Sequence, residues 1–128
     1  MELKATDSRP LFQVLAAQIE DAIVQGIFPE ETQLPSITEY AARYRINPAT
    51  ALKGVTLLVD EGVVYKKRGL GMFVAAGARD ALKEKRRQAF YENYVLPMVT
   101  EARNLGITPQ ALLGLAQRGI SEKQEEQA

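Results

Sequence analysis

The chain has 128 residues, with 16 basic and 16 acidic side chains and a formal net charge of zero. This length fits one compact domain with an appendage. No apolar run approaches the ~20 residues that span a bilayer, and the first ten residues lack the apolar core of a secretory signal. We therefore expect neither a membrane-spanning protein nor a secreted one.

Cysteine and histidine are both absent from the sequence. Their absence removes disulfides, thiolate chemistry and the residue that most often serves as general base or transition-metal ligand. The remaining residues form no nucleophile motif and no identifiable pair of catalytic carboxylates. We therefore expect a cytoplasmic protein that is not an enzyme and that binds no metal or cofactor.

The zero net charge conceals an uneven distribution of charge. Residues 40–59 contain Arg43, Arg45 and Lys53 but no acidic residue. Residues 62–79 contain four basic residues and again no acidic one. A basic face on a neutral protein can still bind phosphate groups.

The first predicted helix follows Pro10. The apolar residues that define it recur at every fourth position: Leu11, Leu15, Ile19 and Ile23. This spacing is typical of an amphipathic helix. Gly26 and Pro29 are expected to end it, and residues 32–34 are expected to be extended.

Two capping motifs predict the starts of two further helices. Ser36 followed by Glu39 is a capping box, in which each side chain accepts a hydrogen bond from the other residue's amide. Asn47 followed by Pro48 supplies a cap and a proline at the first helical position. We expect this third helix to end at Gly62.

The third predicted helix has two different faces. At about 100° per residue, apolar side chains share one side, and a small residue, a cation and a hydroxyl share the other. The residues expected in the core are Ala51, Val55 and Leu58, and those expected on the exposed side are Ala49, Lys53 and Thr56. Two short helices joined by a tight turn, with such a face on the second, indicate a helix-turn-helix motif.

A β-hairpin is predicted after the third helix. Residues 63–67 and 72–75 are rich in side chains that favour strands. The segment Arg68–Gly71 between them contains two glycines, which suit a tight turn. A basic hairpin directly after a helix-turn-helix motif is the wing of a winged helix.

The C-terminal part is predicted to be helical. After a linker at residues 76–78, residues 79–105 have a helical pattern, which Pro97 should kink or divide because proline removes an intrahelical hydrogen bond. The pair Thr108–Pro109 is expected to begin a last helix. Residues 121–128 are polar and are expected to be a disordered tail.

Apolar side chains form a stripe along one side of the predicted C-terminal helices. Two short helices cannot bury such a stripe by themselves, so we expect a second subunit to cover it. The residues expected in this dimer interface are Tyr91, Tyr94, Met98, Ala102, Leu105, Leu112 and Leu115.

These elements predict a mostly α-helical fold with a small β-hairpin. The predicted domains are a winged helix-turn-helix domain over residues 1–76 and a two-helix dimerisation region over residues 77–120, followed by the tail at 121–128.

Residues 34–74, LPSITEYAARYRINPATALKGVTLLVDEGVVYKKRGLGMFV, resemble the GntR family of bacterial winged-helix transcription factors, and the resemblance extends back to about residue 10. The motifs that carry it are LPS before the second helix, NPxT at the third helix and RGxGxFV in the hairpin. The segment EARNLGITPQALLGL is similar to the YtrA subfamily, which implies dimerisation through the C-terminal helices. The resemblance also suggests control by a small-molecule effector of unknown identity.

Residues of the second helix, the third helix and the hairpin are expected to contact DNA. An arginine at the tip of the hairpin can enter a narrow minor groove or bind phosphate. The expected DNA contacts are Ser36, Thr38, Arg43, Arg45, Asn47, Ala49, Thr50, Lys53, Lys67, Arg68, Gly69 and Gly71. Thr38, Ala49 and Leu70 stand where the family more often has basic or small polar side chains.

The function expected from the sequence is that of a sequence-specific transcriptional regulator, a repressor, which binds double-stranded DNA as a homodimer on an inverted-repeat operator. The alternative is a winged-helix module that binds other proteins without binding DNA. The zero net charge favours this alternative slightly.

Overall fold

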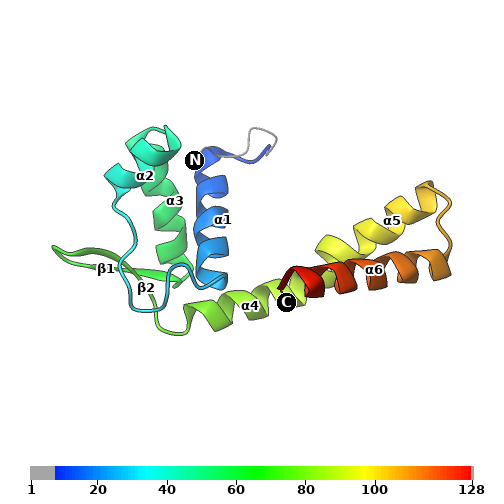
Figure 1. Cartoon of the computed structure of the whole chain (residues 1–128). Coiled ribbons are helices and arrows are strands. Elements are labelled where there is room, and N and C mark those ends of the chain that lie inside the picture. The colour runs from blue at the N-terminus through cyan, green and yellow to red at the C-terminus, as the bar shows by residue number, and fades with distance from the viewer. Residues whose placement is uncertain (1–7, 128) are drawn as a thin grey trace. The chain divides into compact units, whose positions relative to one another are not determined.

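A computed structural model describes residues 8–127 (Figure 1). The protein is mostly helical with one antiparallel β-hairpin, which confirms the predicted fold class. The chain divides into two compact units, one that ends at Lys85 and one that begins at Arg86. Residues 1–7, which belong to the predicted N-terminal domain and to the segment in which no secretory signal is expected, lie outside the described residues.

Three helices form most of the first unit. They are α1 (Leu11–Val24), α2 (Ile37–Tyr44) and α3 (Pro48–Asp60). Both predicted caps are present: the Ser36 hydroxyl accepts a hydrogen bond from the Glu39 amide at 3.1 Å, and the Asn47 side chain accepts one from the Ala49 amide at 2.8 Å. The Glu39 carboxylate in turn accepts from the Ser36 amide at 3.2 Å. These short-range bonds begin the helices where the sequence predicts.

A tight turn joins α2 to α3. Arg45 has a φ of 54°, in the left-handed region that side-chain-bearing residues seldom adopt. This conformation ends α2 and reverses the chain, and Asn47 then caps the next helix. The helix-turn-helix arrangement predicted from the sequence is confirmed.

The hairpin consists of β1 (Val64–Lys67) and β2 (Gly71–Val74), with Val64 opposite Val74. The segment between α1 and α2 pairs with the outer edge of β2. The Leu34 amide donates to the Met72 carbonyl at 2.8 Å, and the Val74 amide donates to the Thr32 carbonyl at 3.0 Å. The extended conformation expected at residues 32–34 is confirmed, and this pairing attaches the hairpin to the body of the first unit.

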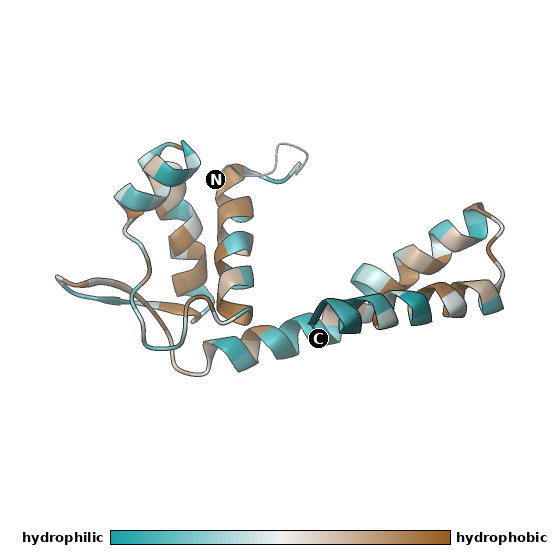
Figure 2. Ribbon diagram, in the orientation of Figure 1, coloured by the Kyte–Doolittle hydropathy of each residue, from teal (hydrophilic) through white to brown (hydrophobic). Residues whose placement is uncertain are grey.

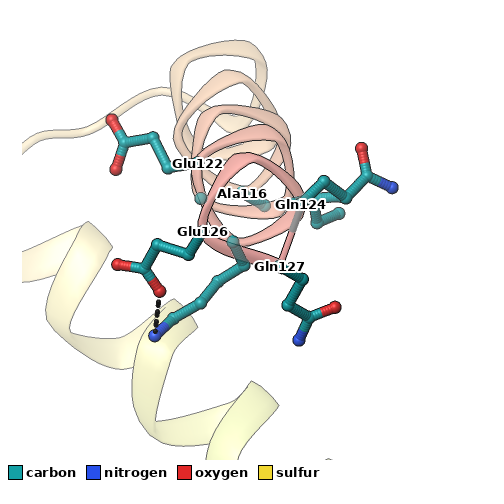
Figure 3. Close-up of a pocket in the computed structure, with 8 residues that line it drawn as sticks. Ala116, Glu122, Gln124, Glu126 and Gln127 are labelled. Carbon is teal, nitrogen blue, oxygen red and sulfur yellow. Dashed lines mark hydrogen bonds and ion pairs between the residues drawn. The ribbon is translucent and has the colours of Figure 1, made fainter.

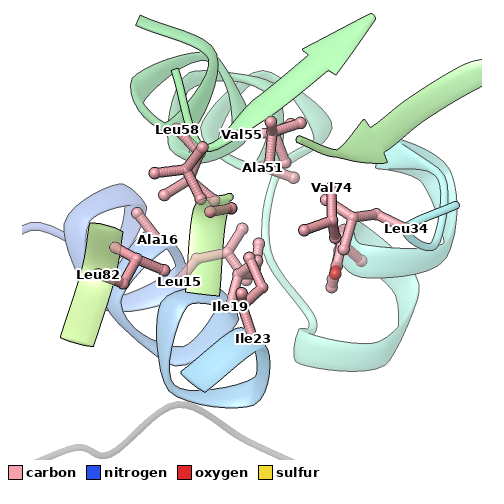
Figure 4. Close-up of a cluster of buried hydrophobic side chains, with 14 of the residues drawn as sticks. Leu15, Ala16, Ile19, Ile23, Leu34, Ala51, Val55, Leu58, Val74 and Leu82 are labelled. Atoms are coloured by element: carbon pink, nitrogen blue, oxygen red, sulfur yellow. The ribbon is translucent and has the colours of Figure 1, made fainter. Parts of the chain in front are cut away.

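The core of the first unit lies between α1, α3, the hairpin and the start of α4 (Ala78–Phe90) (Figure 4). Figure 2 shows apolar residues concentrated along α1 and α3. The buried side chains include Leu15, Ile19 and Ile23 of α1, Tyr40 of α2, Ala51, Val55 and Leu58 of α3, Val64 and Val74 of the hairpin, and Leu82 of α4. The predicted core face of α3 is therefore confirmed.

Close packing of α3 against α1 depends on Gly54, which the sequence analysis did not single out. A Cβ atom at Gly54 would lie 2.8 Å from the Phe12 carbonyl oxygen and 3.2 Å from a methyl carbon of Leu15. Because even an alanine would meet backbone here, the absence of a side chain brings the two helices together.

The first turns of α4 belong to the first unit. Ala78 and Leu82 are buried in its core, and the Arg79 Nε donates to the Val24 carbonyl at 2.9 Å. Lys85 lies 3.9 Å from the Glu61 carboxylate. The compact unit therefore extends beyond the predicted domain boundary at residue 76.

The second unit is helical. Helix α4 continues into a π-helical segment, η1 (Tyr91–Val95), which is followed by α5 (Leu96–Asn104) and α6 (Pro109–Gln127). Pro97 was expected to kink or divide the helix, and the structure has η1 immediately before it, where the Leu96 amide donates to the Tyr91 carbonyl. Proline has no amide to donate, so a change in the hydrogen-bond pattern beside it is physically reasonable.

The last helix is longer than the sequence analysis predicts. The Thr108 hydroxyl caps its start by accepting from the Ala111 amide at 3.2 Å. The tail predicted to be disordered at 121–128 is instead helical as far as Gln127, and Ala128 lies outside the described residues. The segment is composed mainly of good helix formers, and an ion pair from Lys123 to Glu126 (3.2 Å) supports it, so solvent exposure does not prevent the helix from continuing.

Between residues 8 and 127, no helix combines the length and apolarity that a membrane crossing requires.

Candidate nucleic-acid interface

The residues predicted to contact DNA lie on the surface of the first unit. They come from both ends of α2, from the first half of α3 and from the hairpin. Ten of the twelve are exposed, and Thr50 and Gly71 are partly buried. None is taken up in the core, so each is accessible to a partner.

The N-termini of α2 and α3 differ in charge. At α2, the Glu39 carboxylate occupies the end of the helix by accepting from the Ser36 amide at 3.2 Å. A phosphate there would meet a negative charge, so Ser36 can contribute only its hydroxyl hydrogen. The first turn of α3 has no acidic residue, and its cap, Asn47, is neutral. The N-terminus of α3 is therefore the better place for an anion.

The exposed face of α3 includes one residue that the sequence analysis missed. Ala49, Lys53 and Thr56 are exposed, as predicted. Leu52 is also exposed, with 48% of its surface accessible. The helical period places Leu52 about 60° from both Ala49 and Val55, at the border between the exposed face and the core face, so the period alone does not decide its exposure. Aliphatic side chains are usually assigned to the core, which explains why it was not considered.

Lys53 extends toward the start of α1. Its ammonium nitrogen lies 4.2 Å from the centroid of the Phe12 ring, in the geometry of a cation–π contact. The residue remains exposed. The positive charge thus lies at the edge where α3 meets the first turn of α1.

Side-chain contacts support the strands of the hairpin, which carry its basic residues. The Lys67 ammonium lies 4.5 Å from the centroid of the Phe73 ring, and the Tyr65 hydroxyl donates to the Glu31 carboxylate at 2.7 Å. That hydrogen bond raises the pKa of Tyr65 above its ordinary value. The first contact links the two strands, and the second links β1 to the segment between α1 and α2.

The tip of the hairpin is Arg68–Gly71. Its Leu70 carbonyl accepts a hydrogen bond from the Gln33 side-chain amide. Gly71 has a φ of 122°, and a Cβ there would lie 2.7 Å from the Gln33 amide nitrogen, so only glycine fits without displacing that side chain. Arg68 and Leu70 are both exposed. The exposed tip can therefore reach a groove of DNA while the hydrogen bond from Gln33 fixes the conformation of its turn.

The second unit exposes most of the apolar stripe predicted for the dimer interface. Tyr91, Tyr94, Met98, Leu105 and Leu115 each have between 42% and 67% of their surface accessible. Leu112 is partly buried, whereas Ala102 is buried within its own chain and is not available to a partner. Further large apolar side chains of this unit are also exposed, namely Phe90, Leu96, Leu113 and Ile120.

A shallow hollow of about 610 Å³ lies along the second half of α6 (Figure 3). Its lining includes Ala116, Ile120, Glu122 and Gln127, all of them exposed residues. A small molecule at this position would remain largely in contact with solvent. The hollow therefore offers no enclosed site for the effector that the family resemblance suggests.

Comparison with known proteins gives a consistent result. The family model for bacterial regulatory proteins of the gntR family matches residues 11–74. The chain is 30% identical over 115 residues to the uncharacterised HTH-type transcriptional regulator YhcF of Bacillus subtilis, covering 88% of this chain and 92% of that protein. It is 24% identical over 112 residues to the HTH-type transcriptional repressor YtrA of the same organism, covering 88% and 85%.

One similar solved structure is a complex with DNA. It contains the DNA-binding domain of AraR with the operator ORX1, and the similarity has a TM-score of 0.54 and 25% identity, covering 59% of this chain and 95% of that one.

A capped helix-turn-helix motif followed by a basic wing defines a DNA-binding transcriptional regulator. The family match and the similarity to YhcF agree with this class. The chain belongs to the GntR family of bacterial regulatory proteins.

Proposed function

We propose that this protein is a cytoplasmic repressor that binds an inverted-repeat operator as a homodimer. In each copy, α3 enters the major groove, and the tip of the hairpin reaches the flanking minor groove. The observation that carries the proposal is the exposed face of α3, which has a neutral N-terminal cap and a cation at its edge and lies opposite a fully buried core face.

The expected contacts divide into two kinds. Phosphates are bound by Lys53, by Lys67 and by the amides at the start of α3, because these groups carry positive charge or free donors. Arg68 enters the minor groove, where the negative potential is enhanced when the groove is narrow. Further contacts to the sugar-phosphate backbone of the DNA come from residues in α2 and at its two ends, namely Ser36, Thr38, Arg43 and Arg45.

The apolar residues exposed on the second unit support the homodimer. An unpaired patch containing Tyr91, Tyr94 and Leu105 is unfavourable in water, and a second copy with the same patch can cover it by twofold symmetry. Two copies of α3 related in this way would read half-sites about one helical turn, or ~34 Å, apart.

Selection of DNA fragments from a random pool tests the proposal. We expect an inverted repeat, with an affinity that falls steeply as salt increases because bound cations are released from the DNA. The double variant Lys53→Ala with Lys67→Ala removes two phosphate contacts, so it should lower the slope of log affinity against log salt concentration by about two. The control Lys123→Ala, at the far end of α6, should leave it unchanged. A wild-type protein without salt-sensitive binding to any duplex would favour the protein-interaction module instead.

Sedimentation equilibrium tests the dimer separately. Tyr94→Asp places a charge in the apolar patch and should give a monomer. Operator binding should then be at least tenfold weaker, because losing the second half-site costs at least about 1.4 kcal/mol of binding free energy. Gln25→Asp adds the same charge at an exposed position of the first unit and should remain dimeric. If Tyr94→Asp sediments like the wild type, the patch is not the interface.

A further inference from the structure

We propose that α3 recognises thymine through the 5-methyl group of that base, using Leu52 and Ala49. This inference rests on the proposed DNA-binding function and specifies which bases the helix reads. The operator half-sites would contain at least one thymine that faces α3 in the major groove.

The exposed side chains on the first half of α3 are mostly apolar. Pro48, Ala49 and Leu52 are exposed, and the Leu52 side chain has 48% of its surface accessible. Ala51, Val55 and Leu58 of the same helix are buried and form its core face. Leu52 lies three positions before Val55, at the border of that face, and because nearly half of its surface is accessible it is available to a partner.

The polar groups on α3 do not supply the usual means of reading guanine or adenine. Guanine is typically read by two hydrogen bonds from arginine or lysine, and adenine by two from asparagine or glutamine. Residues 48–60 contain no arginine, asparagine or glutamine, and their one lysine is Lys53. The Asn47 side-chain oxygen Oδ1 already accepts from the Ala49 amide at 2.8 Å.

The one cation of α3 is also oriented away from the centre of this face. The Lys53 ammonium lies 4.2 Å from the Phe12 ring centroid, at the border with α1. From there it is suited to a phosphate. On the first half of the face, the methyl groups of Ala49 and Leu52 are exposed and can approach base edges.

Thymine is the base that matches such a surface. Among the four bases of DNA, only thymine presents a methyl group in the major groove. Contact between this methyl and an aliphatic side chain removes apolar surface of both from water, which should change affinity by about fourfold for each methyl buried.

The experiment uses the operator obtained by selection with the full-length protein. Each thymine of one half-site is replaced in turn by deoxyuridine, which differs only in lacking the methyl group. We expect at least one replacement to weaken wild-type binding by about threefold to fivefold. The same replacement should have little effect on binding by Leu52→Ala, since the contact is already lost. Ile27→Ala, at another exposed aliphatic position beyond the end of α1, is the matched control and should keep the wild-type sensitivity.

The outcomes separate this inference from the proposed function. If the protein binds a selected operator with the expected salt dependence but tolerates deoxyuridine at every position, thymine recognition is overturned and DNA binding stands. The same conclusion follows if Leu52→Ala is as sensitive to deoxyuridine as the wild type. If no duplex is bound at all, the proposed function itself fails.

Discussion

The Lys53 ammonium nitrogen lies 4.2 Å from the centroid of the Phe12 ring. This contact joins the middle of α3 to the first turn of α1, two helices that also meet through Gly54. Helix α3, which we propose enters the major groove, is thus positioned on α1 by close packing at Gly54 and by the cation–π contact of Lys53 with Phe12. The stability of this arrangement can be measured independently of DNA.

A double-mutant cycle measures the Lys53–Phe12 contact. Lys53→Met retains the aliphatic stem and Phe12→Leu retains an apolar side chain, so the cycle isolates the contact between charge and ring. We expect a coupling of about 0.5–1 kcal/mol in the free energy of urea unfolding, as is typical of exposed cation–π pairs. Additive effects of the two substitutions would show that the contact contributes nothing to stability.

Gly54→Ala should destabilise the protein. Alanine is the better helix former by about 1 kcal/mol, yet its Cβ would lie 2.8 Å from the Phe12 carbonyl oxygen. Overpacking of this kind costs about 1–3 kcal/mol, so the net change in the free energy of unfolding should be negative.

The matched control is Gly114→Ala in α6, where an added Cβ meets no atom within 4 Å. Helix propensity alone then predicts a gain of up to about 1 kcal/mol. Both variants are compared by urea unfolding followed by circular dichroism. A Gly54→Ala protein as stable as the wild type would contradict the close approach of α1 and α3.

Tyr40→Phe should leave stability unchanged or increase it. The Tyr40 side chain is buried, and among residues 8–127 no hydrogen-bond partner lies near its hydroxyl. Removing a buried, unpaired hydroxyl relieves a desolvation penalty of about 1–3 kcal/mol, and the phenyl ring retains its packing on Tyr44. Thermal unfolding measures the change, with Tyr44→Phe as control. A marked loss of stability would show that the hydroxyl is hydrogen-bonded.

The ionisation of Tyr40 should be visible in an alkaline titration. Burial, with smaller contributions from Tyr44 and Glu39, raises the pKa of Tyr40 well above its ordinary value. In a tyrosinate absorbance titration of the folded protein, Tyr40 should therefore give a late ionisation step, and Tyr40→Phe should remove that step.

The Tyr65–Glu31 hydrogen bond predicts a pH dependence of stability. Because this bond raises the pKa of Tyr65 in the folded protein, its contribution is fully present below the ordinary tyrosine pKa of about 10. It is lost as the pH rises through the raised value, where the tyrosinate would face the Glu31 carboxylate. The difference in free energy of unfolding between wild type and Tyr65→Phe should therefore decrease from pH 8 to pH 11. A constant difference would contradict the prediction.

Helix boundaries in the first unit could be predicted because their causes are local. The bonds between Ser36 and Glu39, and between Asn47 and Ala49, connect residues at most three positions apart. The same holds for the core face of α3, since the helical period assigns Ala51 and Val55 to one side. Such features need no knowledge of the rest of the chain.

The last helix was predicted less well. Residues 121–127 are polar, and polarity alone does not distinguish a disordered tail from an exposed helix. The ion pairs of Arg118 with Glu122 and of Lys123 with Glu126 are compatible with the helix but become visible only in the structure. The π-helical segment before Pro97 was likewise predicted only as an irregularity.

The amino-acid sequence by itself determined the winged helix-turn-helix motif, because capping, periodicity and turn chemistry act within a few residues. Tertiary structure alone decided that Lys53 lies on Phe12, that residues 31–34 pair with β2 and that Leu82 enters the core. Each of these contacts joins segments far apart in the chain. Their geometry follows from how whole helices pack, which no local pattern specifies.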